Sequence, residues 1–184
     1  MRIVAGSLKG RRLDGPTWDG LRPTSDALRE TLFNVLGPTL VGARVLDAFA
    51  GTGAVGIEAL SRGAAAVTFI EQDLRAISLL KRNIAHAGVE NACAIIRDDF
   101  MKPRAQRIDA LSRFDLVFLD PPYEIPGIAA ALASAAARTV PGGRVIIEHS
   151  RRRVLPEAIR GATRYRLLEA GDSALSFYTA GEEA

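Results

Sequence analysis

The sequence has little cysteine, little histidine and no long apolar run, and each shortage excludes a class of protein. Its 184 residues include one cysteine, Cys93, and two histidines. These three side chains leave no disulfide framework and no Cys/His zinc site, so no metal is predicted. Cys93 stands between Ala92 and Ala94, which favours a buried, inert thiol over a nucleophile.

No apolar segment reaches the roughly 18 residues of a membrane-spanning helix, and the first ten residues lack the apolar core of a signal peptide. The alanine-rich stretch Ile128–Ala137 is too short to cross a bilayer and predicts a buried helix. Hydrophobic residues make up 48% and charged residues 24%, which is typical of a globular chain. The sequence therefore predicts a cytoplasmic protein without a membrane partner.

The charge is small in total but unevenly distributed. The formal net charge is +3, which by itself cannot establish a nucleic-acid partner. Residues 1–24 carry +3, residues 25–143 carry −1, residues 144–166 carry +5, and the rest carry −4. Arginine supplies 21 of the 24 basic residues, and its planar guanidinium can bind phosphate bidentately and stack on bases. Genomic base composition explains the excess of arginine over lysine equally well, but it does not explain the segregation.

The chain is predicted to divide near residue 40. Residues 1–40 form an N-terminal extension and residues 41–184 the main domain. Within the extension, residues 2–13 alternate apolar and polar positions around a glycine and predict a small basic β-hairpin. Residues 25–36 have apolar side chains at helical spacing after Ser25, a credible N-cap, and predict an amphipathic helix.

From residue 43, short apolar runs alternate with helical periods. The predicted strands are residues 43–48, 66–71, 92–97, 114–120 and 144–148, and the predicted helices are 54–62, 74–86, 100–111 and 127–138. The strands are joined by crossovers of about a dozen residues or more, and such connections predict a parallel sheet with helices on both faces. Residues 163–168 and 174–179 predict a closing antiparallel hairpin.

A glycine-rich turn, Gly51-x-Gly53-x-x-Gly56, follows the first predicted strand and leads into a helix. Glu71 ends the next strand, 20 residues after Gly51, and suits hydrogen bonds from ribose hydroxyls. This spacing is also the dinucleotide fingerprint, so an NAD-dependent oxidoreductase is an alternative, as is a purely structural turn. Asp47 favours S-adenosylmethionine, because a carboxylate repels a pyrophosphate but tolerates a cationic amino acid.

Asp98, Asp99 and Phe100 follow the third predicted strand. A carboxylate here can accept a hydrogen bond from an adenine amino group while Phe100 covers the ring. Either aspartate is nearly as well explained as a helix N-cap. Together with Glu71, the three residues predict an adenosine site.

The most specific signal is Asp120-Pro121-Pro122-Tyr123, directly after an apolar strand. Two prolines fix φ and remove N–H donors, so the carbonyls of Asp120 and Pro121 can face a ligand. Such acceptors suit an NH₂ group, for example the exocyclic amine of a base, and Tyr123 offers a ring for stacking. Asp120 is predicted to take the proton that the nitrogen loses on methylation. A structural Pro-Pro turn is the alternative.

These motifs together resemble the class I S-adenosylmethionine-dependent amino-methyltransferases. Residues 22–26, Arg-Pro-Thr-Ser-Asp, and residues 29–34, Arg-Glu-Thr-Leu-Phe-Asn, are similar to the bacterial 16S rRNA (guanine-N2)-methyltransferase family (RsmD-like). Residues 1–6 and 60–64 also fit that family. The resemblance covers nearly the whole chain, is most specific in residues 22–71 and is loose after about residue 150.

The resemblance implies a Rossmann-like α/β fold with a seven-stranded, mostly parallel sheet, helices on both faces and an N-terminal β-hairpin extension. It implies methylation of the N2 amine of a guanine in 16S ribosomal RNA, either free or in an assembling small subunit, by a protein expected to be a monomer. The implied catalytic residues are Asp120, Pro121, Pro122 and Tyr123. The implied cofactor-binding residues are Thr24, Asp26, Asp47, Phe49, Ala50, Gly51, Thr52, Gly53, Glu71, Asp98, Asp99 and Phe100. The implied RNA-binding residues are Arg2, Lys9, Arg11, Arg12 and Arg22.

Several alternatives stay open. DNA amino-methyltransferases and protein glutamine methyltransferases share related Pro-Pro tetrads, although DNA enzymes usually need a further target-reading domain. An oxidoreductase that uses NAD and a cofactor-binding RNA module without activity are alternatives from other classes. Residues 151–153, three arginines, are equally well explained as an RNA contact and as an exposed basic turn.

Overall fold

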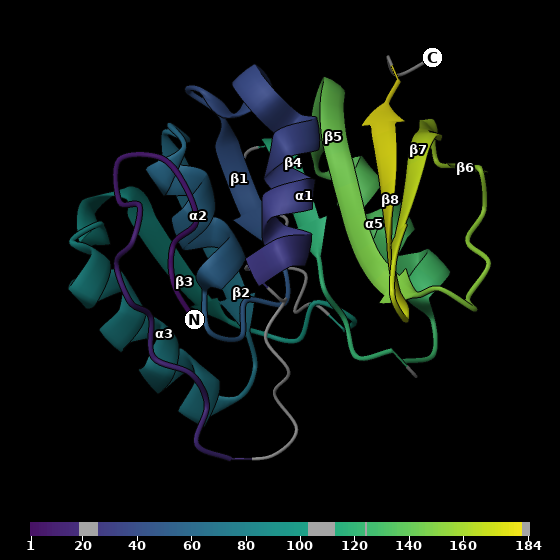
Figure 1. Cartoon of the computed structure of the whole chain (residues 1–184). Helices are drawn as coiled ribbons and strands as arrows, with labels where there is room; N and C mark the ends of the chain where they lie inside the picture. The colour runs from purple at the N-terminus through teal and green to yellow at the C-terminus, as the bar shows by residue number, and fades with distance from the viewer. Residues whose placement is uncertain (19–25, 103–112, 124, 182–184) are drawn as a thin grey trace.

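The computed structural model describes residues 1–18, 26–102, 113–123 and 125–181. In chain order the described elements are α1 (Asp26–Leu36), the 3-10 helix η1 (Gly37–Leu40), β1 (Arg44–Asp47), α2 (Ala54–Ser61), β2 (Ala66–Glu71), α3 (Leu74–Ala87), the 3-10 helix η2 (Glu90–Ala92), β3 (Cys93–Arg97), β4 (Phe114–Leu119), α5 (Ile128–Ala137), β5 (Thr139–Ser150), β6 (Ala158–Ile159), β7 (Ala162–Ala170) and β8 (Ser173–Ala180) (Figure 1). No helix among them has both the length and the apolar character needed to cross a bilayer.

The strands form one mixed sheet in the order β3-β2-β1-β4-β5-β8-β7-β6. Strands β1 to β5 are parallel, and β8, β7 and β6 extend the sheet in antiparallel fashion from β5. The predicted α/β fold class is confirmed. The described sheet has eight strands rather than the seven expected, because β6 is a two-residue edge strand that is too short to produce a recognisable sequence pattern.

The central strands are apolar on both faces because both faces are covered. Val45 of β1 and Phe118 of β4 lie in the core cluster beneath α1, α2 and α3, whereas their neighbours Leu46 and Val117 lie in the cluster beneath α5 (Figure 1). This alternation buries successive side chains against opposite helical layers, as expected for parallel strands.

The predicted strands of the main domain are confirmed, with one notable difference in length. The sequence predicts the fifth strand over residues 144–148, but β5 already begins at Thr139 and runs through Pro141-Gly142-Gly143. The pairing of β4 with β5 shifts register between Phe114 and Leu116, and this irregularity lets the turn-forming residues stay in the strand. Most of the predicted helix 100–111 lies outside the described residues.

The N-terminal segment, residues 1–14, contains less β-structure than predicted. Within it, the expected hairpin is present in short form: Arg2 and Arg12 form an antiparallel bridge, and the N–H groups of Ile3, Gly10 and Leu13 donate to the carbonyls of Arg11, Ile3 and Met1. The backbone N–H groups of Val4 and Ala5 donate to the carboxylate of Glu58, at 2.7 and 2.9 Å, instead of to a partner strand. A side chain from α2 therefore replaces part of the hairpin ladder.

Candidate active site

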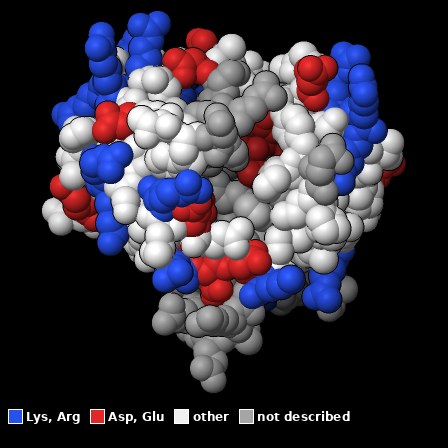
Figure 2. Space-filling model, turned by 90° about the horizontal axis from the view of Figure 1, so that it is seen from below, with Lys and Arg blue, Asp and Glu red and all other residues white. Residues whose placement is uncertain are grey.

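The parallel strands place the predicted site residues at one edge of the sheet. The chain passes from β1 to β2 and β3 on one side and later returns to β4 on the other side, so the strand order reverses between β1 and β4. Open α/β sheets bind ligands at such a switch point, outside the carboxyl ends of the strands. Figure 2 views the molecule from this edge and shows acidic side chains near the centre of the face, with Lys and Arg side chains around its periphery.

The glycine turn and the tetrad leave neighbouring strands at the same level. Asp47, the last residue of β1, pairs with Phe118 of β4, which stands two residues before Asp120. Adjacent strands are about 4.8 Å apart. The sheet register therefore brings together two motifs that are separated by more than 60 residues in the sequence.

The turn itself needs glycine for two reasons. Gly51 and Gly53 have φ values of 52° and 79°, in the left-handed region that side chains disfavour. A Cβ on Gly53 would also lie 2.3 Å from Cδ1 of Leu80 in α3. At Gly56, a Cβ would lie 2.3 Å from the ring of Phe69 in β2, so this glycine lets α2 pack closely on the sheet.

Asp47 lies beneath this turn and is 2% exposed. Its Oδ2 accepts a hydrogen bond from the N–H of Gly56, 3.2 Å away, in the first turn of α2. Burial is the main cause that raises the pKa of this carboxyl to about 7, and the Gly56 N–H partly opposes the shift. Asp47 thus supports the turn directly, and its contact with a ligand stays a prediction.

Glu71 ends β2 and is half-buried beside the turn. Its Oε2 accepts from the N–H of Gly51 at 2.9 Å, and its Oε1 accepts from the N–H groups of Gln72 and Asp73 at 2.7 and 2.9 Å. Three backbone donors hold the carboxylate in a fixed orientation. Because a carboxylate has about four acceptor positions, capacity remains for a hydroxyl donor.

Asp98 and Asp99 follow β3 at the same edge and are half-buried. Asp98 Oδ1 accepts from the N–H of Asp99, and Asp99 Oδ1 accepts from the N–H of Met101, each at 2.9 Å. Phe100 is 2% exposed and meets the half-buried ring of Phe49 edge to face, with centroids 5.8 Å apart. In this pair, Phe49 is the more accessible ring.

The tetrad leaves the end of β4. Asp120 and Tyr123 are half-buried, Pro121 is buried and Pro122 is exposed. The carbonyl of Pro122 accepts from the N–H of Ile125 at 3.0 Å, which closes the turn. The tetrad therefore places a half-buried carboxyl and a half-buried aromatic ring on one turn at the end of β4, and their contact with an amine stays a prediction.

The hydroxyl of Tyr123 has partners that the sequence did not identify. It donates to Oε1 of Glu148, 3.3 Å away, and also contacts Oγ of Ser173. Glu148 is 5% exposed near the end of β5, and Ser173 begins β8. A charged residue inside the apolar run before residue 150 was the available signal, but only the antiparallel pairing of β5 with β8 shows that both residues reach Tyr123.

Arg153 supports the same region from the connection after β5. Its Nη1 donates to the carbonyl of Ile125 at 3.0 Å and so holds the segment that follows the tetrad. Arg151 and Arg152 are exposed. Arg153 thus has a structural contact while Arg151 and Arg152 are exposed, a difference that the sequence alone does not show.

Of the predicted RNA-binding residues, Arg2, Lys9 and Arg12 are exposed. Arg2 and Arg12 face each other across the antiparallel bridge, where Cβ atoms are about 5 Å apart. Arg11 is also exposed, but its Nη1 donates to the carbonyl of Ala87 at 2.7 Å, at the C-terminal end of α3. Two predicted site residues, Arg22 and Thr24, lie outside the described residues.

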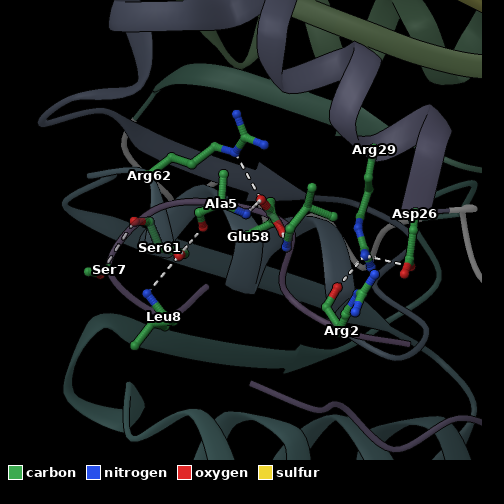
Figure 3. A network of polar contacts seen from close by, with 10 residues as sticks. Arg2, Ala5, Ser7, Leu8, Asp26, Arg29, Glu58, Ser61 and Arg62 are labelled. Atoms are coloured by element: carbon green, nitrogen blue, oxygen red, sulfur yellow. Dashed lines mark hydrogen bonds and ion pairs between the residues drawn. The ribbon is translucent and has the colours of Figure 1, made fainter. Parts of the chain in front are cut away.

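A polar network fixes the N-terminal segment to α1 and α2 (Figure 3). Arg29 is fully buried and donates to the carbonyl of Arg2 at 2.6 Å and to Oδ1 of Asp26 at 2.8 Å. Burial lowers the pKa of Arg29, although Asp26 acts in the opposite direction. Glu58 is also fully buried and binds Arg62 at 2.9 Å. In this structure Asp26, a predicted cofactor ligand, thus binds Arg29.

Comparisons with known proteins agree with this architecture. The model of a protein family described as Conserved hypothetical protein 95 matches residues 1–179. The chain is 35% identical over 161 residues to a putative rRNA methyltransferase, YlbH, of Bacillus subtilis, covering 86% of this chain and 88% of that protein. It is 45% identical over 123 residues to the ribosomal RNA small subunit methyltransferase D of Escherichia coli K12, covering 67% of this chain and 60% of that protein.

A solved structure is similar over the full length. The putative methyltransferase yhhF from Escherichia coli superposes with a TM-score of 0.84 at 33% sequence identity, covering 100% of this chain and 99% of the other. The sheet, its helices and the N-terminal segment therefore have the same arrangement in that protein.

Proposed function

This chain belongs to the family described as Conserved hypothetical protein 95, and on that premise we propose that it transfers a methyl group from S-adenosylmethionine to the exocyclic N2 amine of a guanine in 16S ribosomal RNA. The resemblance stated from the sequence is confirmed by this family membership. The names of the two relatives support ribosomal RNA as the substrate. The choice of guanine N2 is supported by the family resemblance and by the chemistry of the tetrad.

One observation carries the proposal: the glycine turn with Glu71 and the tetrad share one edge of the sheet, at the point where the strand order reverses. A two-substrate transfer requires a donor site and an acceptor site in contact. The turn and Glu71 occupy the ends of β1 and β2, while the tetrad occupies the end of the adjacent β4. A dinucleotide fingerprint alone would not explain the tetrad.

The donor side fits S-adenosylmethionine. The oriented carboxylate of Glu71 has capacity for one ribose hydroxyl, and Asp98 follows β3 as an acceptor for the adenine amine. Phe49 offers a partly exposed ring for the adenine, and Asp47 places a buried carboxyl beneath the turn. When bound, the cofactor supplies a methyl group on a positively charged sulfur.

The acceptor side is built to orient an amine. The Asp120 carboxylate and the Pro121 carbonyl would accept the two N–H groups of the guanine N2, while the base stacks on Tyr123. Both hydrogens are then engaged and the nitrogen lone pair faces the donor side. Asp120 would take one proton from the nitrogen as the nitrogen gains the methyl group, so that the methylated amine ends uncharged.

The RNA would approach along the basic N-terminal segment. Arg2, Lys9 and Arg12 present positive charge, and the close Arg2–Arg12 pair suits a phosphate that relieves their mutual repulsion. Arg22 remains a proposed RNA contact on the basis of the sequence. Arg11 is exposed as well, although one of its guanidinium N–H groups already donates to the carbonyl of Ala87 at the end of α3.

The test is nucleoside mass spectrometry of ribosomal RNA from cells with and without this protein. We expect one N2-methylguanosine in 16S RNA to disappear without the protein and to return when it is restored. If the set of methylated nucleosides is unchanged, the substrate assignment is wrong.

Asp120→Ala tests the mechanism. The variant should bind cofactor with nearly unchanged affinity but lose at least about 100-fold in kcat, because the positioned proton acceptor is gone. Asp115→Ala is the matched control: Asp115 lies on β4, the strand that leads to Asp120, but its Oδ2 accepts from the N–H of Arg44 at 2.7 Å near the opposite edge of the sheet. Near-normal kcat for Asp120→Ala in purified enzyme would contradict the assigned role.

A further inference from the structure

Asn83 is a buried polar residue on a helix face that is otherwise apolar. It is 0% exposed on α3, where Leu80, Ile84 and Ala87 line the same buried side. Apolar packing alone would favour a leucine at this position, because a buried amide is costly unless its hydrogen bonds are made. The carboxamide must therefore be explained by what it contacts.

The Asn83 carboxamide joins two segments far apart in the sequence. Its Nδ2 donates to the carbonyl of Thr52, 2.9 Å away in the glycine turn, and to the carbonyl of Asp14 at 3.1 Å. Its Oδ1 accepts from the N–H of Asp14 at 2.8 Å. Both N–H groups and the oxygen of the carboxamide are thus hydrogen-bonded. One bond reaches the glycine turn, and the other two reach the N-terminal segment.

The bond to Thr52 acts on the middle of the turn. It fixes the peptide between Thr52 and Gly53, next to the position where Gly53 lies against Leu80 of the same helix. On the other side, Oγ1 of Thr52 lies 3.6 Å from the sulfur of Met1. The turn is therefore held between α3 and the first residue of the N-terminal segment.

The N-terminal segment is itself firmly attached, so that it can serve as a support. Glu58 binds the N–H groups of Val4 and Ala5, Ser61 binds the N–H of Leu8 at 3.0 Å, and Arg29 binds the carbonyl of Arg2 (Figure 3). Both helices that flank the turn, α2 and α3, thus share this segment as a common anchor.

We infer that Asn83 is a positioning residue that holds the glycine turn against the N-terminal segment in its cofactor-binding form. The segment that carries Arg2 and Arg12 is thereby linked to the cofactor turn by a buried side chain that hydrogen-bonds to both. This inference rests on the proposed function, because it assigns the turn to S-adenosylmethionine and the segment to RNA.

The first test measures S-adenosylhomocysteine affinity by titration calorimetry. Asn83→Ala removes the bond to Thr52 and should weaken binding about 10-fold, the equivalent of about 1.4 kcal/mol, or one hydrogen bond. Ser61→Ala is the matched control, because it removes buried bonds from the same N-terminal segment but does not touch the turn. Equal affinity losses in the two variants would reduce Asn83 to a general stabilising residue.

Asn83→Asp gives a second measurement if the alanine variant folds poorly. An ionised aspartate keeps the shape and an acceptor for the Asp14 N–H but cannot donate to the Thr52 carbonyl. Its affinity relative to wild type should be low at pH 8 and should recover at pH 5.5, where a buried carboxyl regains a proton to donate. A pH-independent ratio would overturn the inference.

Hydrogen exchange of the wild-type protein tests the link to the N-terminal segment. Saturating S-adenosylhomocysteine should slow exchange in residues 13 and 14 as well as in residues 51–54, and the effect on residues 13 and 14 should be lost in Asn83→Asp. Protection confined to the turn would contradict the link. If the wild-type protein does not bind S-adenosylhomocysteine at all, the proposed function is wrong. If it binds and the affinity is the same in the Asn83 variants, only the inference about Asn83 is wrong.

Discussion

At the scale of single residues, the tetrad depends on side chains outside itself. Tyr123 is held by Glu148 from β5 and Ser173 from β8, so its ring is oriented by the antiparallel half of the sheet. A ring fixed before the base arrives binds it with less loss of conformational entropy. The geometry of the acceptor site therefore includes the part of the chain in which the family resemblance is loose.

A double-mutant cycle measures this coupling. We expect Tyr123→Phe and Glu148→Ala each to lower kcat/KM for RNA about 5-fold to 10-fold, since each removes the same hydrogen bond of roughly 1 kcal/mol. The double variant should be little worse than either single variant, and S-adenosylhomocysteine affinity should not change. Additive losses in the double variant would show that the two residues act independently.

Asp47 gives a pH prediction at the same scale. A carboxyl whose pKa rises from 3.8 to about 7 on folding keeps its proton longer in the folded protein. This preference stabilises the fold fully below pH 4 and is lost as the pH rises through 7. Without cofactor, the free energy of unfolding of wild type relative to Asp47→Asn should therefore fall by roughly 2 kcal/mol between pH 5 and pH 8.

Denaturant unfolding of both proteins at the two pH values checks this prediction. The asparagine variant is the reference because it preserves the shape and cannot ionise. A difference in unfolding free energy that stays constant or grows with pH would show that the Asp47 carboxyl is not destabilised by burial.

At the scale of elements, the N-terminal segment combines a structural and a proposed binding role. Its inward residues Ile3 and Leu13 are in the core, 1% and 4% exposed, while Arg2 and Arg12 face outward. Arg11 donates to the end of α3, where a positive charge also interacts favourably with the helix dipole. The segment is thus a fixed part of the domain that displays basic side chains.

Charge reversal separates these two roles. Arg12→Glu should weaken RNA binding and lower the slope of log K against log salt by about 1, as expected for one lost phosphate contact. Arg113→Glu makes the same change in charge just before β4, at the edge of the sheet opposite the site, and should leave the slope nearly unchanged. Equal slopes for Arg12→Glu and wild type would assign the segment a purely structural role.

At the scale of the whole molecule, ligand binding should stabilise the fold through the turn at the sheet edge. S-adenosylhomocysteine at 100 times its Kd should raise the Tm by roughly 5–10 °C, because binding to the folded state adds about 2.7 kcal/mol. NAD at the same concentration should change the Tm by less than about 1 °C. Stabilisation by NAD without stabilisation by S-adenosylhomocysteine would favour the oxidoreductase alternative.

The whole molecule also explains why a net charge of +3 is a poor guide to the partner. The acidic residues Asp47, Glu71, Asp98 and Asp120 gather at the carboxyl edge, where the proposed cofactor and amine would lie. Lys and Arg side chains lie around the periphery of that face (Figure 2). The acidic residues at this edge thus offset much of the basic charge in the total, so the net charge conceals the exposed Lys and Arg side chains of the periphery.

The sequence alone determined the order of strands and helices, the glycine turn with Glu71, and the tetrad. These features depend on local rules: apolar periodicity, glycine at positive φ and proline without an N–H. The full length of β5 and the two-residue β6 were not predictable in the same way. The extra length of β5 depends on pairing with β4, about 25 residues away, whereas β6 pairs with the adjacent β7 and is too short to produce an apolar period.

Only the tertiary structure decided which side chains support the site. Nothing local to Asn83 shows that it reaches Thr52 and Asp14, and nothing local to Glu148 shows that it meets Tyr123. Both are polar residues in apolar surroundings, so the sequence shows that they need partners without showing which ones. Their partners are fixed by the packing of α3 against the turn and by the pairing of β5 with β8, because contact between distant segments is a property of the packed fold.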